Sequence, residues 1–255
     1  MKTLGLLPIL ALASLLPAAD LKPLMLVPDQ AIFCDDFATP RGELTVKKTD
    51  SEAPWIPNQG TRWEVVDGVL RGRASSPEYQ ASHETHKGVH PRIVLAKTSQ
   101  NYVLRFFMRI VDGAPFDAAK HRSVPPFVEI GHHVCRVTWG ANGAMLLADH
   151  VTLQIASDKD FKLVPGRWYQ VMIERLADEV LVQFTGGPTF HGKHASYVSD
   201  PHFVMLGGLE GGVMEVDDVN VWSLKDGHQA GWPQTLARFP PAQDVRIKEP
   251  KPAAR

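Results

Sequence analysis

The sequence predicts an all-β protein, a two-sheet antiparallel β-sandwich of the jelly-roll type. Short apolar segments recur from residue 31 to residue 222, and many of them alternate with polar residues in a period of two. The chain contains 20 glycines and 20 prolines, which supply turns between these segments, whereas helical periodicity is nearly absent. We count about eleven strands, a number that suits two packed sheets.

Length and charge restrict the function classes. The 255 residues allow one large β domain or two small ones, and 44% of them are hydrophobic, enough for a substantial core. The 27 Lys and Arg residues balance 28 Asp and Glu residues, so no excess charge attracts nucleic acid or an anionic membrane. We therefore expect no nucleic-acid partner.

The N-terminal 19 residues have the layout of a secretory signal peptide. One lysine precedes an apolar run that is too short to span a bilayer, and small residues follow it. A buried N-terminal helix is the alternative. We expect a signal peptide at 1–19, a lead-in at 20–30, and an exported mature protein, periplasmic or extracellular, that is not inserted in the membrane.

The first half of the predicted sandwich contains a hairpin and a long strand. Asp67-Gly68 lies between two apolar runs, and such a pair favours a tight hairpin turn because both positions take positive φ. Residues 101–110 alternate strictly, which predicts a strand with one face in the core. The core residues of that strand are expected to be Tyr102, Leu104, Phe106, Met108 and Ile110.

The second half continues the pattern. Hairpins are predicted over 134–149, with a turn at Asn142-Gly143, and over 168–186, with a turn near Ala177-Asp178. Further strands are expected at 91–97, 202–208 and 214–222. Single helical turns are expected at 116–122 and 156–161. The sandwich domain is thus predicted over 31–224. Residues 225–255 form a tail rich in proline and charge, with a short helix near 233–238.

Several motifs follow one another in a recognisable order. They are DDF (35–37), WEVVDGVLRG (63–72), YVLRFFMRI (102–110), GHHVCRVTWG (131–140), PGRW (165–168) and DDVNVW (217–222). This order resembles the concanavalin A-like jelly-roll proteins, LamG-like or laminarinase-like, that are grouped with the 3-keto-disaccharide hydrolase domain family. The resemblance covers residues 31–224 and implies a concanavalin A-like fold and a carbohydrate ligand.

One departure from the laminarinase pattern concerns catalysis. Laminarinase-type enzymes of this architecture carry Glu-x-Asp-x-x-Glu on one strand, and retaining hydrolysis needs two carboxylates about 5–5.5 Å apart. The nearest segment here begins at Glu215 and ends at Asn220, which cannot act as an acid, and it reads as a closing strand. The sequence thus identifies no catalytic residue. If the protein is an enzyme, the resemblance implies a glycoside hydrolase or lyase.

The stretch HETHKGVH (83–90) contains three histidines. A zinc-protease helix needs histidines at i and i+4, but His83 and His86 are three apart, and Gly88 and a proline follow. A loop is predicted. A Ca²⁺ or Zn²⁺ site at His83, His86 and His90 is the alternative to a polar loop without a cofactor. The resembled family has a histidine-glycine pair here, which makes His86 a candidate ligand contact.

GHHVCRVTWG is predicted as a strand with two different faces. His133, Cys135, Val137 and Trp139 would be buried, whereas His132 and Arg136 would share the open face with Val134 and Thr138. An imidazole and a guanidinium side by side can bind a hydroxyl-rich or carboxylated ligand. The alternative is that Arg136 pairs with a nearby acid, Glu129 or Asp149.

The remaining candidates are acids, an aromatic residue and the cysteines. Asp149 follows a strand and is a further candidate contact, and Trp55 is the loop aromatic expected to stack on a sugar. If the first and last strands pair, the acids Asp35, Asp36, Asp217 and Asp218 could gather as a calcium site or serve as turn caps. Cys34 and Cys135 either form a disulfide or are two buried thiols.

Two functions remain open after the sequence, besides that of a structural domain without a small ligand. The first is an exported concanavalin A-like domain that binds a carbohydrate or glycoconjugate and, if it is an enzyme, cleaves it. The alternative is a non-catalytic interaction module at the cell surface or in the periplasm, which the lack of a paired-glutamate motif favours.

Overall fold

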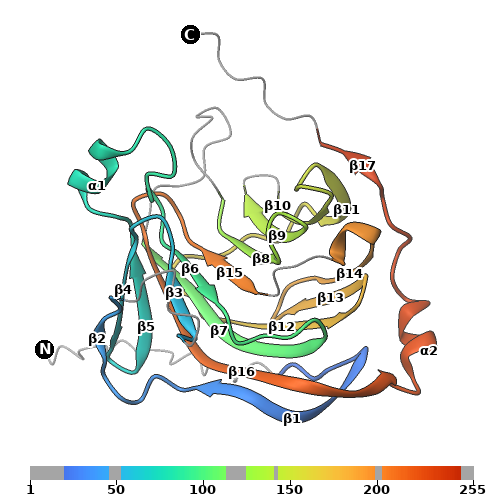
Figure 1. Cartoon of the computed structure of the whole chain (residues 1–255). Helices are drawn as coiled ribbons and strands as arrows, with labels where there is room; N and C mark the ends of the chain where they lie inside the picture. The colour runs from blue at the N-terminus through green and yellow to red at the C-terminus, as the bar shows by residue number, and fades with distance from the viewer. Residues whose placement is uncertain (1–19, 46–52, 113–124, 141–142, 199–202, 248–255) are drawn as a thin grey trace, which may run out of the picture.

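The computed structural model describes residues 20–45, 53–112, 125–140, 143–198 and 203–247, and the strands there form two antiparallel sheets packed face to face (Figure 1). The nine-stranded sheet has the order β14 (Thr189–Lys193), β13 (Glu179–Phe184), β12 (Tyr169–Leu176), β7 (Tyr102–Asp112), β16 (Val213–His228), β5 (Val69–Arg73), β4 (Arg62–Val66), β2 (Gly42–Glu43), and β1 (Leu26–Asp35) pairs with β16. The eight-stranded sheet has the order β17 (Val245–Arg246), β11 (Leu153–Asp158), β10 (Gly143–Ala148), β9 (Cys135–Gly140), β8 (Phe127–Ile130), β15 (Val204–Gly207), β6 (Arg92–Leu95), β3 (Trp55–Pro57).

The predicted all-β sandwich is confirmed, and its core lies between the sheets. The five β7 residues predicted to face the core are all at most 3% exposed, and they pack with alternate residues of the opposite sheet, such as Val128 and Val137. The sheets contain more strands than the expected eleven or so because several are very short. β2 and β17 have two residues each, too few for any alternation to show in the sequence.

The predicted turns have the expected backbone geometry. Asp67 and Gly68 connect β4 to β5 with φ angles of 53° and 74°, and Ala177, with a φ of 51°, connects β12 to β13. Gly140 pairs with Gly143 at the end of the β9–β10 hairpin, whereas Asn142 lies outside the described residues. Left-handed turn positions thus set the register of these hairpins.

The short helices differ from those expected. α1 (Pro77–Ser82) was not predicted, although its start has a clear signal: Ser76 accepts a hydrogen bond from the Tyr79 N–H, and Pro77 occupies the first turn. The helical turn expected at 156–161 is wrong, since β11 continues to Asp158. The turn expected at 116–122 lies outside the described residues, and α2 (Trp232–Leu236) overlaps the helix expected near 233–238.

β16 is a central strand, which corrects its interpretation as a closing one. It lies between β7 and β5, and its later residues also pair with β1. Glu215 on this strand is 1% exposed and accepts a hydrogen bond from Arg71 Nε at 2.8 Å and another from Arg109. Two guanidinium groups therefore neutralise the first acid of the laminarinase-like segment.

The first described residues and the segment that follows β16 pack on the outer face of the nine-stranded sheet. The backbone N–H groups of Leu24, Met25 and Leu26 donate to the fully buried carboxylate of Glu174 at 2.7–2.9 Å. Trp232 of α2 covers Met25 and Leu26 together with sheet residues in a second apolar cluster. β1 and β16 consequently extend past the limits of 31 and 224 expected for the sandwich.

The cysteines do not form a disulfide, and only one of them is buried. Cys135 is in the core, where burial raises the pKa of its thiol to about 12, whereas Cys34 is exposed on β1. None of the helices in the described part of the chain combines the length and apolar character needed to cross a membrane.

Candidate functional site

The candidate site lies on the outer face of the eight-stranded sheet. Pairing along β6, β15, β8 and β9 places Arg92, Gly207, Phe127 and Thr138 in one cross-strand row, because each is the register partner of the next. Glu129 and Arg136 face each other in the adjacent row. The intervening residues of these strands belong to the core, so side chains of both rows point to the other face. We call Arg92, Phe127, Glu129 and Arg136, with the neighbouring His90 and His133, the Arg92–Arg136 cluster.

The Phe127 ring at the centre of this cluster can lie over β15 because Gly207 has no side chain. A Cβ atom at Gly207 would come within 2.2 Å of the Phe127 ring, so the ring packs directly on the bare backbone of β15. Both guanidinium groups lie on this ring, with Arg92 Cζ 5.2 Å and Arg136 Cζ 4.6 Å from its centroid. The ring thus brings two cations from different strands together.

The carboxylate of the cluster, Glu129, bonds to Arg136 and not to Arg92. Glu129 is fully buried, and its Oε2 accepts from Arg136 Nε at 2.7 Å and also from Arg136 Nη2. Its Oε1 accepts the backbone N–H of His133 at 3.0 Å. The alternative in which Arg136 pairs with an acid is therefore correct, and the acid is Glu129.

His90 and Arg92 have side-chain nitrogen atoms without a hydrogen-bond partner. Arg92 Nη2 lies 2.9 Å from His90 Nε2, which must accept because a guanidinium can only donate. His90 is 4% exposed, and burial, together with the charges of Arg92 and Arg136, lowers its pKa to about 3. Burial and the charge of Arg136 also lower the pKa of Arg92, to about 10. At neutral pH, His90 is therefore neutral and Arg92 is a cation.

The predicted alternation of GHHVCRVTWG fails at its beginning. Residues 131–134 form a turn in which His133 has a φ of 60°, and β9 starts only at Cys135. Cys135, Val137 and Trp139 are buried as expected, but the His133 side chain is 42% exposed. His132 is exposed beside it, with the two ring centroids 4.1 Å apart. Both imidazoles therefore lie at the end of the strand that carries Arg136.

The HETHKGVH segment is a loop, as predicted, and its three histidines have different surroundings. His83 stacks on Tyr79 with ring centroids 3.9 Å apart, His86 is exposed with a φ of 54°, and His90 is buried against Arg92. Across the described residues, no group of three or more His, Cys, Asp or Glu side chains is arranged to hold a metal ion. Figure 1 shows α1 and this loop beyond the upper ends of β4 and β5.

Two other candidate site residues, Trp55 and Asp149, lie outside the Arg92–Arg136 cluster. Trp55 is not a loop aromatic: it lies on β3, is 2% exposed, and donates from Nε1 to Asp35 at 3.0 Å. Asp149 occupies a turn after β10 and accepts from Arg246 Nη1 at 2.9 Å rather than joining Arg136. Short segments between prolines give no alternation from which burial could be predicted, which explains the error at Trp55.

The aspartates near β1 and β16 approach one another because these strands pair as expected. Asp35 accepts from Arg41 Nη2 at 2.5 Å, and Asp218 accepts from Arg105 Nη2 at 2.8 Å. Burial and the charges of Asp218 and Asp36 raise the pKa of Asp217, although the Asp218 N–H opposes the shift. Two of the four acids thus have arginine partners, and the arrangement favours structural roles over a calcium site.

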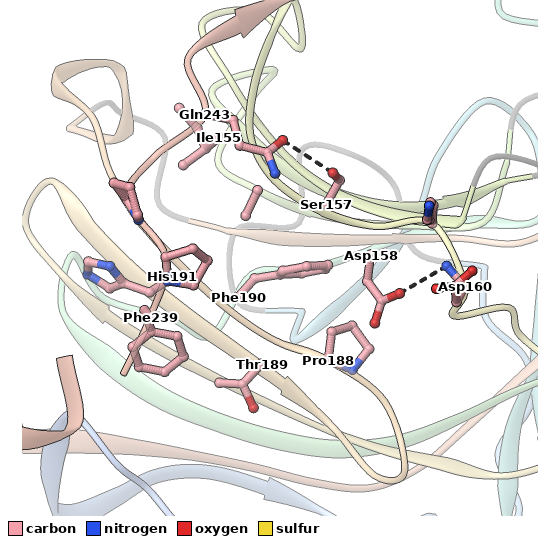
Figure 2. Close-up of a pocket in the computed structure, with 14 residues that line it drawn as sticks. Ile155, Ser157, Asp158, Asp160, Pro188, Thr189, Phe190, His191, Phe239 and Gln243 are labelled. Carbon is pink, nitrogen blue, oxygen red and sulfur yellow. Dashed lines mark hydrogen bonds between the residues drawn. The ribbon is translucent and has the colours of Figure 1, made fainter. Parts of the chain in front are cut away.

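A hollow of about 540 Å³ lies elsewhere, between β11 and β14, where the segment before β17 crosses the open side of the sandwich (Figure 2). Its apolar lining includes Phe190 and Phe239. Its polar groups bond to one another: Gln243 Oε1 accepts from Ser157 at 3.2 Å, and Asp158 accepts the N–H of Asp160. Among the described residues, none of the buried polar atoms that lack a hydrogen-bond partner lines this hollow, whereas Arg92 Nε is one such atom in the cluster.

Comparisons with known proteins support the architecture. No protein-family model matches the chain, and no curated protein matches its sequence significantly. A β-1,3-glucanase from Mycobacterium marinum is similar in structure, with a TM-score of 0.50 and 12% identity over 76% of this chain and 99% of that chain. The carbohydrate-binding module CBM66 from Bacillus subtilis has a TM-score of 0.46 and 10% identity over 67% of this chain and 96% of its own. At these identities, the glucanase likeness shows the concanavalin A-like jelly-roll fold alone.

Proposed function

We propose that the protein binds a carbohydrate or glycoconjugate on the outer face of its eight-stranded sheet. The observation that carries this proposal is the Arg92–Arg136 cluster, in which guanidinium and imidazole groups gather around an aromatic ring. Saccharide hydroxyls need donors and acceptors at fixed positions, and a few polar groups in an otherwise apolar face supply them. His132 and His133 at the rim are exposed enough to reach a ligand.

Similarity in architecture to a β-1,3-glucanase is in keeping with a saccharide ligand. The resemblance to the 3-keto-disaccharide hydrolase family points the same way. Export is part of the proposal, because residues 1–19 have the layout of a signal peptide. Those residues lie outside the part that the structure describes.

Binding without cleavage is the version of this function that the geometry favours. Glycoside hydrolysis uses two carboxyl groups, about 5–5.5 Å apart in retaining enzymes and about 6.5–9.5 Å apart in inverting ones. Glu129 is the carboxylate of this cluster in the described part of the chain, and Arg136 and the His133 N–H occupy both of its oxygens. In the described part of the chain, this cluster therefore lacks the second carboxyl group that hydrolysis uses.

The test is a binding screen with the mature protein and a panel of neutral and acidic oligosaccharides. We expect at least one saccharide to bind and His132→Ala to weaken that binding, because His132 is an exposed group beside the cluster. Lys225→Ala, which changes an exposed residue of the nine-stranded sheet, is the control and should leave binding unchanged. Absence of binding to every saccharide, or equal effects of the two substitutions, would refute the proposed site.

A further inference from the structure

We infer that the ligand of the Arg92–Arg136 cluster carries a carboxylate, as a uronic acid does, and that Arg92 is the residue that recognises it. This inference rests on the proposed carbohydrate-binding function and specifies its ligand class.

The charge balance of the cluster is the first observation. Two guanidinium groups lie on the Phe127 ring, but Glu129 is the one carboxylate beside them in the described part of the chain, and it bonds to Arg136. No ion pair joins Arg92 to an acid within the described ranges, and its recorded hydrogen bond runs to the neutral His90. The cluster therefore has an excess positive charge at Arg92, which a bound anion would neutralise.

Unsatisfied donors on the same side are the second observation. Because His90 Nε2 accepts from Arg92, the proton of the neutral ring is on Nδ1. That nitrogen and Arg92 Nε are both buried without a hydrogen-bond partner. Buried donors in folded proteins nearly always have acceptors. Two unpaired N–H donors on adjacent side chains therefore indicate that the ligand supplies an acceptor.

The shape of the Arg92 guanidinium group favours a carboxylate as its ligand. Arg92 has used one of its five N–H donors on His90, and its planar fork matches two carboxylate oxygens. The bare backbone at Gly207 lets Arg92 reach across β15 to the Phe127 ring, which holds the guanidinium plane in place. His132 and His133 remain for the hydroxyl groups of the same saccharide.

The experiment compares matched ligands that differ in the carboxylate alone. Oligosaccharides of polygalacturonate, alginate and hyaluronan are titrated by calorimetry beside their carboxyl-reduced forms, with a sulfated galactan oligosaccharide as a third arm. We expect at least one acidic form to bind about tenfold or more tightly than its reduced partner, and more weakly as salt increases. Arg92→Gln should abolish that difference, whereas Arg73→Gln, which removes an exposed arginine of the other sheet, should preserve it.

Each outcome decides a separate point. Equal binding of acidic and reduced forms overturns the inference and leaves carbohydrate binding intact, whereas no binding in any arm overturns both. Equal or tighter binding of the sulfated oligosaccharide overturns the assignment of a carboxylate. A preference that survives in Arg92→Gln overturns the role of Arg92. If Arg92→Gln does not fold, Arg92→Lys, which keeps the charge without the fork, should reduce the preference.

Discussion

His90 should make the stability of this protein depend on pH between neutrality and pH 3. In the folded chain, burial and the charges of Arg92 and Arg136 lower its pKa to about 3, from an ordinary value of 6.5. Below pH 6.5, the unfolded chain therefore binds a proton that the folded chain does not. The stability that depends on the neutral ring is complete above pH 6.5 and is lost progressively as the pH falls.

The size of this effect follows from the two pKa values. Linkage gives a loss of about 2 kcal/mol in the free energy of unfolding between pH 7 and pH 5, and a total of about 4 kcal/mol by pH 3. We expect His90→Gln to remove this part of the pH dependence. Gln keeps an acceptor for Arg92, which donates to His90 Nε2 at 2.9 Å, and has no proton to gain.

Urea denaturation at pH 7 and pH 5 measures the difference. The wild-type chain should lose about 2 kcal/mol more than His90→Gln over this interval, after the effects of the other histidines cancel between the two proteins. His86→Gln, at an exposed position of the same loop, is the control and should behave like the wild type. Equal losses in wild type and His90→Gln would refute a buried neutral imidazole, as would an NMR titration of His90 with a midpoint near 6.5.

Three further predictions concern groups outside the candidate site. Glu174→Ala removes the acceptor of three backbone N–H groups, two of them buried, and should lower the free energy of unfolding by about 3 kcal/mol or more. Glu174→Gln, which keeps one acceptor, should lose less, and urea denaturation compares the two variants. Burial raises the pKa of Glu179, but its hydrogen bonds to two histidines outweigh burial and lower the pKa overall. The stabilisation by ionised Glu179 is therefore complete above about pH 4.3 and is lost in more acid solution. Glu179→Gln should be less stable than the wild type at pH 6 by about 1–3 kcal/mol, and this difference in stability should narrow below pH 4. In the folded protein, a thiol reagent should modify Cys34 alone, and Cys135 should react only in denaturant, as mass spectrometry would show; rapid double modification without denaturant would contradict its burial.

Local features of the sequence were sufficient for the long strand β7 and for the β4–β5 hairpin turn. The alternation from Tyr102 to Ile110 predicted which face of β7 is buried, and Asp67-Gly68 predicted a hairpin, because pleat and turn geometry depend on residues only a few positions apart. The same reasoning failed at Trp55, where a three-residue strand has no period to detect. It also failed at His133, where a turn delays the start of β9.

The candidate site depended on contacts between strands. The sequence offered Glu129 as one of two partners for Arg136, and the β8–β9 register decided between them. Nothing local to Arg92 indicates that Gly207, far along the chain, would leave room for it to reach Phe127.

By itself, the sequence determined the all-β class, the hairpins and the inward face of the long strand, since hydrophobic alternation and turn residues act over short range. Only the tertiary structure decided which side chains meet on the outer face. Sheet order joins residues that are distant in the chain, and burial there sets the charge of His90. Among the residues that the structure describes, the same order gives Arg92 no acidic partner.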